Sequence, residues 1–351
     1  MTASERISAT LERRTVDRCP VDLWCTREVL DTLRAHTGEE DELAVYQALG
    51  LDKIVWVFPR YRGRVVDPNE GGTRNLWGVA TRAVQAGAAT YNEVADAPLH
   101  AAASPADVDA YSEWPDPDGF DYAEARAAAE RARDFGFATI GPWISHFEVY
   151  CQMRGLENAL MDVLVEPQIL EAALVHIDRI QTEMLERYLS ELDDTLDIVF
   201  ISDDMGTQDR PLISLAVWKQ FFEARLTRWC EIVHRHGKKV QFHSDGAIRD
   251  LIPSLIACGV DILNPIQHLC PGMDRAGLKR DFGEALIFHG AVDNQRALPF
   301  GSVDDVVRET RANIETLGAG GGYICCSCHN VQAGTPVENI VAMIETAHAA
   351  R

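Results

Sequence analysis

Eight short runs of apolar residues, each bounded by polar residues or glycine, recur along this 351-residue chain. Runs that are apolar on both faces are typical of strands in a parallel sheet that helices cover. Amphipathic helical stretches separate the later runs, at 215–237, 247–259 and 303–318. This alternation predicts a parallel α/β fold, and eight candidate strands favour a (β/α)₈ TIM-type barrel over an open sheet. The runs are 17–24, 53–58, 138–143, 197–204, 239–246, 261–267, 286–293 and 322–330.

The interval from about residue 60 to residue 120 interrupts this alternation. It contains a glycine-rich segment, RGRVVDPNEGGTRNLWG, and then a proline-rich segment that ends near residue 120. We interpret residues 60–120 as an insertion that holds a small hairpin and surface loops. Because one barrel with extra segments accounts for the length of the chain, we expect residues 1–351 to form a single domain.

The charge and the cysteine content narrow the class of protein. The net charge of −21 argues against nucleic acid and anionic membrane surfaces as partners, because both attract clustered Lys and Arg. No apolar run has the length of a membrane span, and the first residues lack the apolar core of a secretory signal. Nine cysteines, an odd number, then predict reduced thiols and a cytoplasmic protein.

Polar and ionisable residues follow five successive apolar runs. In a barrel of this kind the chemistry is located at the C-terminal ends of the strands, so these side chains would converge on one pocket. Each residue alone could be a helix cap, but five strands that end alike predict a functional site. The residues are Asp203, Asp204, His243, Asp245, Asn264, Gln267, His289, Asp293, Cys328, His329 and Asn330.

The spacing His243-x-Asp245 is compatible with half of a metal site. Alternate residues of a strand face the same side, and an imidazole with a carboxylate suits Zn²⁺. Cys328 or His329 from the last strand could complete the set, and three protein ligands would leave a fourth position open, as in a catalytic zinc site. The alternative is a hydrogen-bonded His–Asp pair that lines an organic substrate pocket without a metal.

The last run contains three cysteines and a histidine within five positions. Regular strand alternation places Cys325 and Ser327 on the face of His329, and Cys326 and Cys328 on the opposite face. Cys325 and Cys326 would then lie too deep for chemistry and would be core residues, while Cys328 and His329 reach the rim. The preceding GAGGGY, at 318–323, lacks the spacing of a dinucleotide loop and precedes its strand, so we do not expect a phosphate site there.

The chain resembles the uroporphyrinogen decarboxylase superfamily, which includes cobamide-linked methyltransferases. The resemblance is carried by ERISATLERRTVDRCPVDLW, MRGLENALMD, DDMGTQ, HGKKVQFHSDGAIRDLIPSLIACGVDILNPIQ, HGAVDNQ and HNVQAGTPVENI. It extends over nearly the whole chain and implies a (β/α)₈ barrel with its site at the C-terminal ends of the strands. It also implies that homodimers are possible.

Within this superfamily, the residues resemble the methyltransferase branch more than the true uroporphyrinogen decarboxylases. True uroporphyrinogen decarboxylases hold the substrate carboxylates with arginines of an N-terminal motif, whereas PVDLWCTREVL offers only Arg27, so porphyrinogen decarboxylation is disfavoured. The methyltransferase branch holds zinc with His-x-Cys and a later Cys, and in this chain Asp245 replaces the first Cys. This harder ligand set favours an oxygen-bearing substrate over a thiol.

The resemblance therefore implies a zinc-assisted methyltransferase of the O-demethylase type. It would move a methyl group between a small, methoxylated substrate and a corrinoid (cobalamin) carried by a partner protein. Two alternatives stay open: a metal-free decarboxylase of a small acid, and a non-catalytic protein that binds corrinoid or another ligand. In the enzyme, Asp203, Asp204, His289 and His329 would orient the substrate or move its proton. The expected substrate-binding residues are Asn264, Gln267, Asp293 and Asn330.

Overall fold

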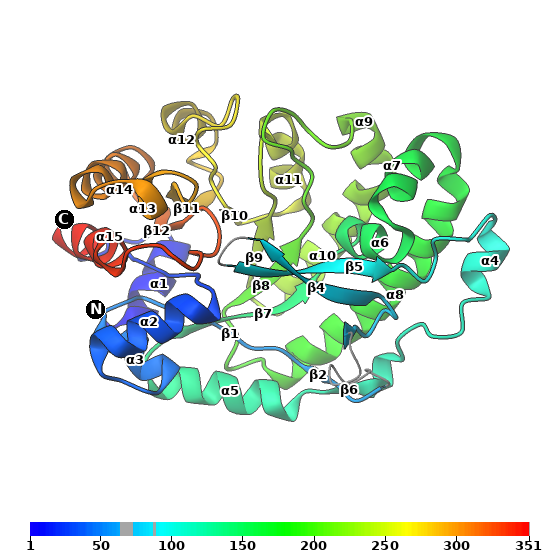
Figure 1. Cartoon of the computed structure of the whole chain (residues 1–351), viewed down its shortest axis with the longest axis horizontal. Coiled ribbons are helices and arrows are strands. Elements are labelled where there is room, and N and C mark those ends of the chain that lie inside the picture. The colour runs from blue at the N-terminus through cyan, green and yellow to red at the C-terminus, as the bar shows by residue number, and fades with distance from the viewer. Residues whose placement is uncertain (64–72, 87–88, 351) are drawn as a thin grey trace.

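The computed structural model describes residues 1–63, 73–86 and 89–350, and its centre is a curved sheet of seven parallel strands (Figure 1). The strand order is β1-β7-β8-β9-β10-β11-β12, so neighbours in the sheet follow one another along the chain once β2 to β6 are set aside. All seven strands coincide with predicted apolar runs. Their bounds are Ile54–Trp56 (β1), Ala138–Ile144 (β7), Ile198–Ser202 (β8), Lys239–His243 (β9), Ile262–Asn264 (β10), Ile287–Val292 (β11) and Tyr323–Ser327 (β12).

The first predicted run, 17–24, does not form a strand, so the expectation of eight strands is corrected to seven. This segment lies between the two edge strands: Asp22 N donates to Cys325 O of β12 at 2.8 Å, and Asp52 N donates to Val21 O at 2.7 Å. Only an isolated bridge, Val21 to Cys325, results there. A regular ladder fails because Pro20 has no N–H and because the Asp22 side chain, in place of a backbone carbonyl, accepts the bond from Leu23 N.

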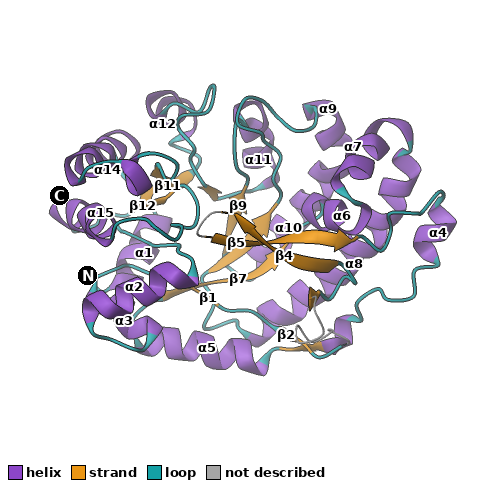
Figure 2. Ribbon diagram, viewed as in Figure 1, coloured by secondary structure: helices purple, strands orange, loops and turns teal. Residues whose placement is uncertain are grey.

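Helices surround the outside of the curved sheet, as Figure 2 shows. The three predicted helical stretches are found, although 215–237 is divided by a π-helical turn, Lys219–Glu223. The N-terminal helices and the C-terminal helix lie on the same side of the molecule (Figure 1). Helix bounds are Ala3–Leu11 (α1), Arg27–Thr37 (α2), Glu42–Ala48 (α3), Pro105–Asp109 (α4), Ala123–Asp134 (α5), Phe147–Arg154 (α6), Leu156–Val165 (α7), Pro167–Glu191 (α8), Leu215–Trp218 (α9), Ala224–Arg235 (α10), Ile252–Cys258 (α11), Arg275–Phe282 (α12), Ala297–Phe300 (α13), Val303–Leu317 (α14) and Val337–Ala349 (α15).

The predicted insertion contains the expected hairpin. Strands β4 (Ala80–Ala86) and β5 (Ala89–Asp96) pair antiparallel, and β3 (Thr73–Arg74) adds to β4. A separate pair is formed by β2 (Arg60–Tyr61) and β6 (Phe120–Asp121), at the two ends of the predicted insertion. Residues 64–72 and 87–88 of the predicted insertion lie outside the described residues.

The inner face of the sheet is filled by isoleucines near the N-terminal ends of the strands. Ile7 and Leu11 of α1 pack against this layer, so α1 closes that end of the sheet. Bulky β-branched side chains suit the inside of a curved parallel sheet, where they fill the space between facing strands. The polar residues are therefore left for the opposite end. The isoleucines of this layer are Ile54, Ile140, Ile198, Ile262, Ile287 and Ile324.

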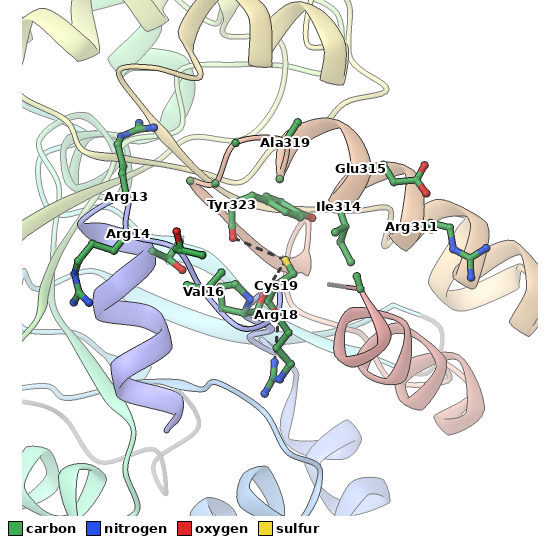
Figure 3. A pocket seen from close by; sticks show the side chains of 18 of the residues that line it. Arg13, Arg14, Val16, Arg18, Cys19, Arg311, Ile314, Glu315, Ala319 and Tyr323 are labelled. Atoms are coloured by element: carbon green, nitrogen blue, oxygen red, sulfur yellow. Dashed lines mark hydrogen bonds between the residues drawn. The ribbon is translucent and has the colours of Figure 1, made fainter. Parts of the chain in front are cut away.

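A cavity of about 700 Å³ lies at the start of β12, where the glycine-rich loop 318–322 leads into Tyr323 (Figure 3). Three arginines on its walls already have partners. Arg13 donates to Gly283 O at 2.9 Å, Arg14 to Glu12 Oε2 at 2.7 Å and Arg18 to Asp52 Oδ2 at 2.5 Å. These bonds tie the arginines to the fold. Among the described residues, no helix is both long enough and apolar enough to cross a bilayer.

Candidate metal centre

His243, Asp245 and His329 come together at the C-terminal ends of β9 and β12. His243 is the last residue of β9, Asp245 follows two residues later, and His329 lies two residues beyond the end of β12. One potential ligand atom from each residue lies within 4.8 Å of the other two. Two imidazoles and a carboxylate are a donor set that Zn²⁺ accepts, with a fourth position left for solvent or substrate.

Asp245 gives the clearest sign that this group fits a cation. Its Oδ1 atom is buried and has no hydrogen-bond partner among the described residues. Burial, and then the negative charge of Asp204, raise the pKa of the Asp245 carboxyl. A buried carboxylate oxygen without a partner is costly, and a coordinated divalent cation would remove that cost. The residues present therefore fit a zinc ion.

His329 is prepared to act as a ligand in its neutral form. Burial lowers the pKa of its imidazole, so the ring carries no charge at neutral pH. The rings of His329 and His243 lie with their centroids 6.0 Å apart. Because only a neutral imidazole nitrogen can bind a metal, the low pKa of His329 favours coordination.

Two further carboxyl groups border this trio. Asp204 Oδ1 lies 3.7 Å from His243 Nε2 and accepts a hydrogen bond from Asp245 N at 2.9 Å, while about half of its side chain is exposed. Glu148 lies deeper and accepts a hydrogen bond from Ser202 Oγ at 3.0 Å. Burial, followed by the charge of Asp204, raises the pKa of Glu148 to about 8. Glu148 therefore carries a proton at neutral pH, as a general acid must.

A line of buried polar side chains continues inward from His243. Its Nδ1 lies 2.6 Å from Asn264 Oδ1, and Asn264 Nδ2 lies 2.6 Å from His289 Nδ1. His289 Nε2 then lies 3.1 Å from Asp22 Oδ2, and Lys53 Nζ donates to Asp22 Oδ1 at 2.9 Å. Although burial opposes ionisation, the Lys53 ammonium lowers the pKa of Asp22 below its ordinary value. His289 is thus a buried neighbour of the site and does not reach its surface.

Asp22, His289 and Cys326 form a second group of potential ligand atoms. This group is less suited to a metal, because the facing atoms of Asp22 and His289 already bond to each other. Burial also raises the pKa of the Cys326 thiol, so the sulfur keeps its proton. The trio nearer the surface is therefore the better candidate for a metal site.

Aromatic rings form one wall of the site. The Trp24 ring stacks on His243 with centroids 6.1 Å apart, and Phe200 lies 5.6 Å from His243. Trp56 contacts both Trp24 and Phe200. A cavity of about 340 Å³ opens beside Trp24 and Trp56 and is also lined by Asn330. The rings thus give the site an apolar wall, whereas His243, Asp245 and His329 are not among the residues that line this cavity.

Several predicted site residues point elsewhere. Asp203 accepts hydrogen bonds from Ser145 Oγ and from the backbone N–H groups of residues 146–148, so its carboxylate caps the start of α6. Asp293 accepts from Gln295 N and Ala297 N at the start of α13. Gln267 accepts from Gly246 N at 2.9 Å and supports the loop after Asp245. These three side chains hold the loops that surround the site.

The expected orientation of the cysteines in β12 is wrong. Cys326 packs on the inner face of the sheet with Ile324, whereas Cys325 belongs to the outer core. The strand ends at Ser327, so regular alternation does not extend to the next two residues. Cys328 Sγ donates to Ile266 O at 3.2 Å, while His329 joins His243 and Asp245. All nine cysteines are free thiols, and Cys325, Cys326 and Cys328 are buried.

Sequence reasoning missed Asp22, Lys53, Glu148 and the two tryptophans of the wall. Asp22 did offer a signal, since it is a carboxylate within a predicted apolar run, although that run does not form the expected strand. Glu148 lies in α6 and gave no comparable signal. Its position beside Asp204 depends on the packing of α6 over the end of β8, which only the structure shows.

Comparison with known proteins adds the following. The family described as uroporphyrinogen decarboxylase (URO-D) matches the chain over residues 90–350. A methyltransferase from Methanosarcina mazei has a similar structure, with a TM-score of 0.69 and 18% identity, and 99% of each chain is covered. A 3-keto-D-glucoside 4-epimerase from E. coli matches with a TM-score of 0.43 and 16% identity, over 65% of this chain and 84% of that one. No curated protein matches the sequence.

Proposed function

Because the chain belongs to the uroporphyrinogen decarboxylase (URO-D) family, we propose that it is a methyltransferase whose zinc ion is held by His243, Asp245 and His329. It would move a methyl group between a small methoxylated molecule and a corrinoid carried by a partner protein. The fold shared with a methyltransferase over 99% of both chains supports this choice within the family.

The observation that carries the proposal is the geometry of the trio. Its three ligand atoms lie within 4.8 Å of one another, and Asp245 Oδ1 is a buried oxygen with no partner among the described residues. When bound there, zinc would act as a Lewis acid on the heteroatom that carries or receives the methyl group. Two nitrogen ligands and one oxygen ligand, with no thiolate, favour an oxygen atom in that position.

The other residues of the site would bind the substrate and manage its proton. The rings of Trp24 and Phe200, which contact His243, would form an apolar wall for the organic part of the substrate. Glu148, protonated at neutral pH, would give its proton to the oxygen from which the methyl group departs. Asp204, at the exposed edge, would accept the hydrogen bond from Asp245 N and so hold the backbone at Asp245 in place.

The charge of the site disfavours a carboxylate-rich substrate. After burial, the negative charges of Asp204, Asp203 and Asp245 contribute to the raised pKa of Glu148. The nearby Lys53 is already committed to Asp22. Among these residues no side chain offers a free positive charge to the carboxylates of a porphyrinogen, which disfavours such a substrate.

The direct test combines metal content with methyl transfer. We expect the purified protein to hold about one zinc per chain by elemental analysis, and to methylate a reduced corrinoid protein from a methoxylated donor. The reaction would be followed by the visible spectrum of the corrinoid. A protein without zinc that shows no spectral change with a broad panel of methoxylated donors would contradict the proposal.

A decarboxylase of a small acid is the second candidate. The protonated Glu148 favours it, because such a reaction ends with the transfer of a proton to carbon. It would require no metal. Release of CO₂ by the metal-free protein, with no methyl transfer by the zinc-loaded protein, would decide for this alternative.

A further inference from the structure

Four buried side chains form a continuous hydrogen-bonded line from the core to the candidate metal centre. The line runs from Asp22 through His289 and Asn264 to His243, with contacts of 3.1, 2.6 and 2.6 Å. Asp22, His289 and Asn264 are fully buried, and His243 is 7% exposed. Water therefore does not compete for these bonds, and each group must satisfy its neighbours.

The direction of every bond in this line follows from Asp22. Its ionised carboxylate can only accept, so His289 Nε2 carries a hydrogen and donates it. Lys53 already supplies the counter-charge to Asp22, so a neutral His289 suffices and its Nδ1 accepts. Asn264 must then donate from Nδ2 to His289 and accept at Oδ1.

The last bond of the line determines the state of the residue at the surface. Because Asn264 Oδ1 accepts, His243 must carry its hydrogen on Nδ1. The lone pair of His243 is then on Nε2, the atom that lies 3.7 Å from Asp204 at the edge of the site. We propose that Asp22 is a positioning residue that fixes the Nδ1–H tautomer of His243 through His289 and Asn264, and thereby presents the Nε2 lone pair to the site.

A single buried substitution, Asp22→Asn, should reverse the donor and acceptor roles in every hydrogen bond of this line. In Asp22→Asn, the amide oxygen should take the place of Oδ1, which accepts from Leu23 N and Lys53 Nζ. The amide nitrogen would then take the place of Oδ2, so Trp24 Nε1 would lose its acceptor and His289 Nε2 would receive a hydrogen bond. His289 would donate from Nδ1, the Asn264 amide would turn over, and the hydrogen of His243 would move to Nε2.

The tautomer of the metal-free protein provides the test, and it does not require the proposed function to be correct. In ¹⁵N-histidine NMR spectra, with His243 assigned by its loss in His243→Gln, we expect Nδ1–H in the wild type and Nε2–H in Asp22→Asn. Asp162→Asn is the matched control. Asp162 is also a buried carboxylate that binds a cation, Arg154, but it lies outside this line, so His243 should stay Nδ1–H.

A second variant keeps the test decisive if Asp22→Asn does not fold. Asn264→Leu leaves the Asp22–Lys53 pair intact but removes the link, so His243 should show a mixture of both tautomers. An Nε2–H or imidazolium form of His243 in the wild type overturns the inference. An unchanged Nδ1–H form in both Asp22→Asn and Asn264→Leu overturns it as well.

The consequence for metal binding rests on the proposed function. If His243 is a ligand, Asp22→Asn should weaken zinc binding about 10- to 100-fold in a competition with a coloured chelator, as the loss of a supporting hydrogen bond usually does. A reversed tautomer with unchanged zinc affinity would support the line of bonds and count against His243 as a ligand. The two failures are therefore distinguishable.

Discussion

The two ends of the central sheet both carry charged side chains, but they differ in how those groups are used. The cavity at the start of β12 has about twice the volume of the one beside Trp24, yet its Arg13, Arg14 and Arg18 are held by nearby acceptors of the fold. At the C-terminal ends of the strands, Asp245 Oδ1 has no partner among the described residues. The unpartnered carboxylate oxygen beside two imidazoles, and not the volume of a cavity, is therefore the reason to place the candidate site at this end.

The strongest test of this contrast is the removal of one imidazole from the trio. We expect His243→Ala and His329→Ala each to lose zinc to background levels and to abolish methyl transfer, because two ligands seldom retain zinc. Elemental analysis of the purified variants measures this directly. Cys325→Ser, Cys326→Ser and Cys328→Ser should keep both properties, since these thiols are buried and lie outside the trio. Zinc retained in both histidine variants would remove the contrast between the two ends.

The next effect concerns Glu148, whose pKa near 8 defines a pH dependence. If its proton is used, activity should fall as pH rises above 8, and Glu148→Gln should reduce the rate about 100-fold or more. The measurement is the initial rate from pH 6 to 9.5 in both proteins. A variant with the wild-type rate and the same pH profile would exclude Glu148 from proton transfer.

Glu148 should also affect stability, with a sign that follows from its raised pKa. The folded protein keeps the proton up to about pH 8, whereas the unfolded chain loses it near pH 4.5, so stability falls as pH rises through this window. At pH 9, metal-free Glu148→Gln should be more stable than the wild type by about 1–2 kcal/mol, because the carboxyl is mostly but not fully buried and keeps part of its hydration. Urea unfolding at pH 5 and pH 9 measures the difference, which should disappear at pH 5 or below.

At the same end of the sheet, Asp203 has a structural role, in contrast to the proposed ligand Asp245. Asp203→Ala leaves three buried N–H groups at the start of α6 without their acceptor, so we expect a loss of about 3 kcal/mol of stability. Zinc content should remain at the wild-type level. Thermal unfolding and elemental analysis of one preparation test both statements, and a stable variant that lacks zinc would contradict them.

The smallest effect is expected at the opposite end of the sheet. Arg14 pairs with Glu12 in a largely exposed ion pair, so Arg14→Ala should change the free energy of unfolding by no more than about 0.5 kcal/mol. Zinc content and methyl transfer should not change. Any loss of activity in this variant would show that the larger cavity takes part in function.

The features that depend on a local sequence pattern could be predicted from the sequence. Seven of the eight predicted strands, the helices between the later strands and the proximity of His243 to Asp245 all follow from periodicity and short spacing. The sequence was insufficient where two distant segments meet. Asp22 lies 267 residues before His289, and no local pattern predicts that contact. The predicted faces of Cys328 and His329 were wrong for another reason. Side chains alternate between the two faces only within a strand, and β12 ends at Ser327.

The bridge between the first extended segment and β12 also has a consequence for biosynthesis. His243 is synthesised well before His329. The segment that carries Asp22 cannot pair with β12 until that last strand has been synthesised. Contacts between residues this far apart in the chain form late in folding. A nascent chain that ends before β12 would hold only two of the three proposed ligands, so zinc would be acquired only after translation has passed β12. Uptake of the metal would then report that the sheet has assembled from its first segment to its last strand.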